Sequence, residues 1–274
     1  MVPPDLTDDD IAWIKSYAEE VTAVFTAEFR EAGDRFKQWQ PLLDRLAQAV
    51  DAVATNGRSY FRAVDEAHNE LCIASAILSN PDPKIIRLEY EPPLPGCAKS
   101  IDFRATAESG AVYYVDVKTI KPGSKDRWQQ YVRAVNEKWL PKDVSVILSK
   151  QWLGGELWHY MFTARGRMLE YALELENKIA EATLAGENVF FTLALCGAGF
   201  HWREDHLEDF VSFYYSGTHR ADDPFSQAEQ KYMLENNISV KRTVSSFACM
   251  SRPQGTIRQR RLNWRVQPPP APFL

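Results

Sequence analysis

The chain has 274 residues, of which 45% are hydrophobic, 12% aromatic and 25% charged. This composition is typical of a globular protein and excludes disordered, collagen-like and coiled-coil chains. The formal net charge of −5 counts weakly against nucleic acid as a partner, because phosphate groups are bound by clustered lysines and arginines. The distribution of charge along the chain therefore matters more than its sum.

The cysteines and the N-terminus indicate the compartment. Four cysteines lie far apart and form no C-x-x-C pair, which argues against a zinc ribbon or a disulfide scaffold. The N-terminus lacks the basic start and apolar stretch of a signal peptide, and the best apolar run, Val189 to Phe200, is too short to cross a bilayer. We expect a cytoplasmic protein without a membrane partner.

The first third of the chain is predicted to be helical. From Asp8 to about Val53, apolar residues recur every three or four positions, and Thr7 is placed to cap the helical start. Asn56-Gly57 predicts a break, and a second helix fits Tyr60 to Ser79. The first 31 residues hold eight acidic and two basic side chains, which indicates a solvated acidic face.

The period then changes from helical to alternating. Three strands are predicted, at Lys84 to Tyr90, Ser100 to Thr106 and Val112 to Ile120. The later elements are predicted in this order: a helix over 126–139, a strand over 144–148, a long helix over 165–184, a buried strand over 189–195, helices over 205–215 and 224–235, a strand over 240–250, and an extended tail at 268–270.

The segment Ser100 to Lys121 is the one that indicates chemistry. If its two strands form a hairpin symmetric about Ser109, Asp102 faces Asp116 across the pair. Two sets of side chains then alternate: Asp102, Arg104, Tyr114, Asp116 and Lys118 on one face, and Ile101, Phe103, Ala105, Tyr113, Val115 and Val117 on a core face. Opposed aspartates repel unless a cation or a proton intervenes. Hard oxygen ligands suit Mg²⁺ or Mn²⁺, and a nearby lysine can orient a water, help to deprotonate it or stabilise developing charge. This pattern predicts metal-dependent hydrolysis of a phosphodiester.

Asp102 followed by Asp116-Val117-Lys118 resembles the PD-(D/E)xK nuclease superfamily, which has the restriction-endonuclease-like fold. The resemblance covers about Tyr60 to Leu148 and implies an α/β protein with an α-β-β-β-α-β core, its last strand being either 144–148 or 189–195. It implies metal ligation by Asp102 and Asp116, help from the Val117 carbonyl, and action of Lys118 on the attacking water. Ile101 stands where the family has proline, and Asp116 where glutamate is more frequent.

The family also uses residues on neighbouring helices. An acidic residue on the preceding helix is a common further catalytic and metal-binding group; the best match is Glu70, with Glu66 one turn earlier as the alternative. A glutamine on the following helix brings in Gln129 or Gln130, with Tyr131 beside them. Basic residues and aromatics alternate after Lys118, which suits a nucleic-acid contact surface as well as a solvated helix face. The residues predicted to contact nucleic acid are Lys121, Lys125, Arg127, Gln130 and Arg133.

These observations predict three regions. An N-terminal helical region over 1–58 precedes a PD-(D/E)xK-like nuclease core over 59–200, and a C-terminal α/β extension over 201–274 packs on this core. The expected activity is Mg²⁺- or Mn²⁺-dependent cleavage of nucleic acid, with DNA favoured over RNA. The alternative is a catalytically inactive protein of the same fold that binds nucleic acid or serves protein assembly. A homodimer is compatible with either.

Overall fold

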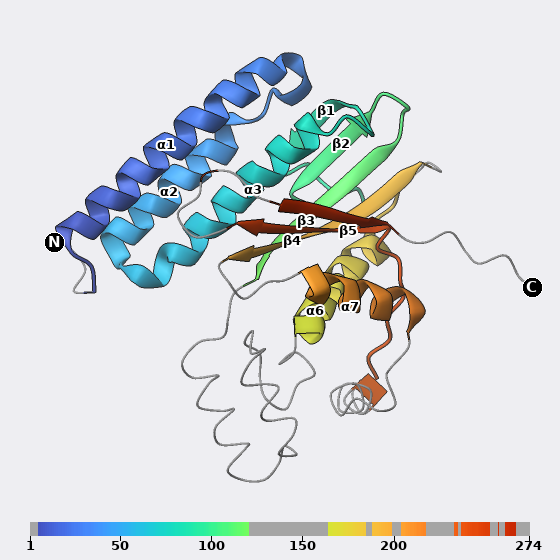
Figure 1. The fold of residues 1–274 in the computed structure, drawn as a ribbon. Coiled ribbons are helices and arrows are strands. Elements are labelled where there is room, and N and C mark those ends of the chain that lie inside the picture. Colours follow the sequence, from blue (N-terminus) through green and yellow to red (C-terminus); the bar gives the residue numbers. More distant parts are fainter. Residues whose placement is uncertain are drawn as a thin grey trace, which may run out of the picture.

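The computed structural model of the chain describes residues 5–120, 164–184, 188–198, 204–217, 233–234, 237–252, 257 and 261–266. Within these residues, six strands form one mixed sheet with helices packed on both of its faces (Figure 1). The predicted α/β class is confirmed. No helix in the described part of the chain is long and apolar enough to cross a membrane.

Three helices precede the sheet: α1 (Asp8–Ala32), α2 (Gln40–Asn56) and α3 (Phe61–Ser79). Thr7 caps α1 as predicted, because its hydroxyl accepts a hydrogen bond from the Asp10 backbone N–H at 3.1 Å. The helical pattern predicted from residue 8 to 53 is confirmed, but it is divided into two helices that the sequence did not separate. Gly33, with a φ of 57°, ends α1, and a short 3-10 helix turns the chain before α2.

The sheet begins with an antiparallel meander of β1 (Ile85–Tyr90), β2 (Phe103–Ala107) and β3 (Val112–Ile120). Arg104 lies opposite Tyr114, which is the register predicted from the turn at Ser109. β4 (Val189–Ala198) runs parallel to β3, so it is the buried strand predicted at 189–195. The predicted helix at 126–139 and strand at 144–148 lie outside the described residues.

Two strands extend the sheet beyond β4. β5 (Ser246–Arg252) runs parallel to β4, and β6 (Arg261–Val266) runs antiparallel to β5. The strand predicted from residue 240 begins only at residue 246. β6 was not predicted, although its apolar residues alternate with polar ones in the sequence. The tail at 268–270 and most of the helix predicted at 224–235 lie outside the described residues.

Hydrophobic residues cover both faces of the sheet. One cluster lies between the sheet and α1–α3, and the other joins the opposite face to α6 (Ala164–Glu181) and α7 (Glu204–Ser216) (Figure 1). The face that carries Asp116 is therefore covered as well: Tyr114 is buried there and stacks on Phe191 at 5.4 Å between ring centroids. The prediction that Ile101 shares a face with Phe103 is wrong. Ile101 packs with Tyr114 instead, because β2 begins only at Phe103 and strand alternation does not extend before it.

A buried carboxylate connects α6 to the segment before β5. Glu176 is 2% exposed and accepts hydrogen bonds from the Tyr214 hydroxyl at 2.5 Å and from the backbone N–H groups of Lys241 at 2.9 Å and Arg242 at 2.6 Å. Arg242 has a φ of 57°, and its backbone N–H and that of Lys241 both donate to the Glu176 carboxylate. The carboxylate thus accepts hydrogen bonds from the backbone of the segment that precedes β5.

We expect Glu176→Gln to lower the free energy of unfolding by about 2 kcal/mol, because an amide N–H₂ would face backbone donors that require an acceptor. Urea denaturation followed by circular dichroism measures the change. Glu20→Gln, on the exposed side of α1, is the control and should alter stability by less than about 0.5 kcal/mol. Equal stability of the two variants would contradict the role given to Glu176.

Candidate functional site

Asp102 lies where β2 meets the second half of β3. Its Oδ2 accepts a hydrogen bond from the Val117 backbone N–H at 2.5 Å, and its own carbonyl accepts one from the Glu91 N–H at 2.8 Å. The regular pairing of β2 with β3 begins at Phe103. The Val117 N–H lies beyond this pairing, and the Asp102 carboxylate accepts its hydrogen bond instead. This position holds the carboxylate next to Asp116 and Lys118.

Asp116 is 1% exposed and lies between two lysines. Lys178 of α6 donates to Oδ1 at 2.7 Å, and the Nζ of Lys118 lies 3.2 Å from Oδ2. Oδ2 nevertheless has no hydrogen-bond partner within the described residues. The Nζ of Lys118 also lies 3.5 Å from Glu174. Burial tends to lower the pKa of Lys118, but the carboxylates of Asp116 and Glu174 outweigh it and hold this pKa above its usual value. Lys118 is therefore an ammonium group.

The charge of Asp116 acts on Asp102, so the two carboxylates lie near each other. Burial raises the pKa of Asp102 to about 6, and the negative charge of Asp116 adds to the increase. The Val117 N–H and the two lysines oppose it. The repulsion between the two carboxylates is thus only partly offset in the folded protein. A cation bound between them would reduce this repulsion.

Glu70 of α3 belongs to the same group of charges. It is 4% exposed, and its Oε2 accepts hydrogen bonds from Arg45 at 2.7 Å and from the Tyr90 hydroxyl at 3.1 Å. Burial and then the charge of Asp102 raise the pKa of Glu70 to about 8, while Arg45 opposes the increase. Glu66, the alternative on the same helix, instead pairs with Arg62 at 2.5 Å. The structure therefore brings Glu70 to Asp102.

Several members of this group were not predicted from the sequence. Arg45 comes from α2, Tyr90 ends β1, and Lys178 comes from α6. No local motif marks them, because each reaches the group only through packing of its own element against the hairpin. Glu174 and Lys178 lie one helical turn apart, a spacing that by itself fits an ordinary ion pair on a helix surface.

The predicted nucleic-acid contacts lie outside the described residues. These are Lys121, Lys125, Arg127, Gln130 and Arg133, and the candidates Gln129 and Tyr131 lie there too. Their assignment remains a prediction. The described part of the site consists of residues from α2, α3, the hairpin and α6.

The donor atoms suit a hard divalent cation. Within the described ranges, no three carboxylate, imidazole or thiolate groups are arranged to hold a metal ion. Among the described residues, however, the buried Oδ2 of Asp116 has only the Lys118 ammonium near it, at 3.2 Å. The carboxylate of Asp102 lies close enough for the charge of Asp116 to raise the pKa of Asp102. Two carboxylates are the usual protein contribution to a Mg²⁺ site that keeps waters and binds phosphate. The residues therefore fit such an ion, with Glu70 as a further carboxylate behind Asp102.

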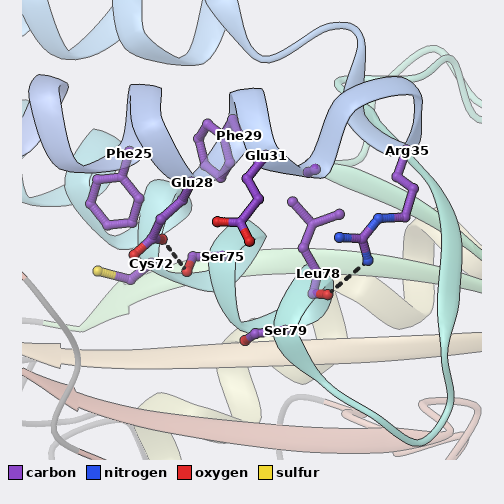
Figure 2. A pocket seen from close by; sticks show the side chains of 10 residues that line it. Phe25, Glu28, Phe29, Glu31, Arg35, Cys72, Ser75, Leu78 and Ser79 are labelled. Atoms are coloured by element: carbon purple, nitrogen blue, oxygen red, sulfur yellow. Dashed lines mark hydrogen bonds between the residues drawn. The ribbon is translucent and has the colours of Figure 1, made fainter.

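A separate groove of about 440 Å³ lies between α1 and α3 (Figure 2). Ser75 donates to Glu28 at 2.7 Å, and Arg35 donates to the Leu78 carbonyl at 3.1 Å. These polar groups connect the two helices, and the groove shares no residue with the carboxylate group. We assign it a packing role.

Comparison of the chain with models of known families, with curated proteins and with solved structures gave no match. The interpretation of the site therefore depends on its own geometry and on the resemblance of its motif.

Glu70 makes a pH-dependent contribution to stability. Because folding raises its pKa from 4.5 to about 8, the folded state binds the additional proton, and stability falls as pH increases through this window. We expect the free energy of unfolding of the wild type to fall, relative to Glu70→Gln, by about 1–3 kcal/mol between pH 5 and 8.5. Urea denaturation in EDTA at several pH values measures this difference.

Glu66→Gln, one turn earlier on α3, is the matched control, because it removes a carboxylate that pairs at the helix surface. It should leave the pH dependence of the wild type in place. A constant difference between wild type and Glu70→Gln across the range would contradict the placement of Glu70 beside Asp102.

Proposed function

We propose that this protein is a Mg²⁺- or Mn²⁺-dependent nuclease of the PD-(D/E)xK type that hydrolyses phosphodiester bonds, with DNA favoured over RNA. One observation carries the proposal: Asp102 lies close enough to the buried Asp116 to feel its charge across the hairpin, next to the ammonium of Lys118. These are the three residues of the sequence motif.

The order and direction of the elements support the same proposal. A helix, α3, is followed by the antiparallel meander β1–β2–β3, and β4 then runs parallel to β3 after a connection that contains α6. The described elements are compatible with the α-β-β-β-α-β order that the resemblance implies, although the helix expected at 126–139 lies outside the described residues. Glu70 reaches Asp102 from the helix in the position where the family has its additional acidic residue.

Each residue of the group then has a role. Asp102 and Asp116, with Glu70 behind them, would hold the metal ion, and the ion would offset the negative charge of the scissile phosphate. Lys118 is held as an ammonium, so it is a donor that orients a water oxygen and stabilises negative charge that develops on the phosphate. Its pKa disfavours a role as a proton acceptor in the metal-free protein.

A specific observation favours the alternative, a catalytically inactive module that binds nucleic acid or another protein chain. The carboxylates already have internal cations: Glu70 pairs with Arg45, and Asp116 pairs with Lys178. Buried charges that are paired in this way can be a structural feature of the core. The alternative predicts binding or assembly without cleavage.

We expect the wild type to cleave duplex or single-stranded DNA, or RNA, in the presence of Mg²⁺ or Mn²⁺ and not in EDTA. Asp116→Asn and Lys118→Met should each reduce the cleavage rate about 100-fold or more, because each removes charge stabilisation of the transition state. Gel assays with labelled substrates measure these rates.

Lys84→Met is the control, because Lys84 also lies beside the sheet but pairs on the surface with Glu108. It should cleave like the wild type. Folded Asp116→Asn and Lys118→Met proteins that cleave at the wild-type rate would overturn the nuclease proposal, and so would a wild type that cleaves none of these substrates with either ion.

A further inference from the structure

Lys178 occupies a position that oxygen ligands define. Its Nζ donates to Asp116 Oδ1 at 2.7 Å and to the Ser100 backbone carbonyl at 3.2 Å, and its side chain is only 13% exposed. A carboxylate oxygen and a backbone carbonyl oxygen are the kinds of ligand that hard divalent cations take. The ammonium of Lys178 thus contacts the atoms that a metal ion at Asp116 would use.

The charges of the group explain why an internal cation is present. Asp116 is buried, and the ammonium groups of Lys118 and Lys178 lie 3.2 and 2.7 Å from its two oxygens. A charge in a poorly solvated position is stable only when it is compensated. A divalent ion on Oδ1 would take over the compensation that Lys178 gives, and the ion and the ammonium would repel each other at this distance. The Lys178 ammonium would then leave Asp116, and a phosphodiester bound at the ion would supply one negative charge.

Lys118 is less suited to leave the group. It extends from β3 itself, two residues beyond Asp116, and its ammonium is also attracted by Glu174. Lys178 reaches across from a different element, α6, and carries no second carboxylate contact among the described ion pairs. A change in its side-chain rotamer would free Asp116 Oδ1 without moving the strand.

We propose that Lys178 is a positioning residue that holds Asp116 in place of the metal and releases it when the metal ion and a phosphodiester bind together. This inference rests on the proposed nuclease function. The free protein then binds divalent ions weakly, and nucleic acid strengthens this binding. By linkage, the ion strengthens nucleic-acid binding by the same factor.

Binding of Mn²⁺ to the protein tests the inference without an activity measurement. Titration followed by the electron paramagnetic resonance signal of free Mn²⁺ is carried out with and without a single-stranded phosphorothioate oligonucleotide. The oligonucleotide should tighten Mn²⁺ binding to the wild type about tenfold or more. Lys178→Met should bind Mn²⁺ about tenfold tighter than the wild type without the oligonucleotide, and should gain less than about threefold when it is added.

Three further variants make the result specific. Lys178→Gln keeps a hydrogen-bond donor without the charge and should also bind Mn²⁺ tighter, which covers the case in which Lys178→Met fails to fold. Lys84→Met should bind like the wild type. Asp116→Asn should abolish the binding and thereby locate it.

The outcomes separate the two proposals. If the Lys178 variants bind Mn²⁺ no tighter than the wild type, while Asp116→Asn abolishes binding, Lys178 does not compete with the metal and the inference is overturned, but the nuclease proposal stands. If no variant binds more Mn²⁺ than Asp116→Asn does, with or without the oligonucleotide, both proposals fail.

Discussion

The buried carboxylate of Asp116 is the constraint on which the site depends. A side chain that is 1% exposed can carry a negative charge only if positive charge lies beside it, and two lysines supply that charge from opposite directions. Lys118 comes from the same strand, whereas Lys178 requires that α6 pack over this face of the sheet. The position of α6 is in turn connected through Glu176 to the segment that leads into β5. The negative charge of Asp116 in β3 is therefore compensated in part because α6 packs on the sheet and brings Lys178 to it.

The sequence predicted the local features of the site, because local rules determine them. The turn at Ser109 specifies the register in which Arg104 lies opposite Tyr114, and this register brings Asp102, just before β2, near Asp116. The helical pattern over α3 places Glu70 on that helix. Arg45 and Lys178 could not be predicted in the same way, since only tertiary packing brings α2 and α6 to the hairpin. The errors have similar causes. Gly33 ends a helix although the sequence pattern is helical on both sides of it. Ile101 lies just before β2, so the alternation of side chains within the strand does not apply to it.

A nuclease and an inactive module would differ in one physical property of the carboxylates and cations around Asp116. In both interpretations the carboxylates are compensated by internal cations when no metal is bound. A nuclease must be able to exchange one of these cations for a metal ion, whereas a structural core has no need to do so. The pairing of Asp116 is uneven, which favours exchange: Lys178 donates to Oδ1 at 2.7 Å, whereas Oδ2 has only the Lys118 ammonium at 3.2 Å among the described residues. The net charge of −5 says little about this, since the charges that matter are a small set at the end of one hairpin.

A crystal structure with Mn²⁺ and a phosphorothioate oligonucleotide, solved with anomalous data, tests the central claim most directly. The account predicts an anomalous peak about 2.0–2.4 Å from a carboxylate oxygen of Asp116 and near Asp102, with the ammonium of Lys178 moved away from Asp116. Ordered Mn²⁺ bound elsewhere, with Lys178 still paired to Asp116 and the oligonucleotide in place, would contradict it.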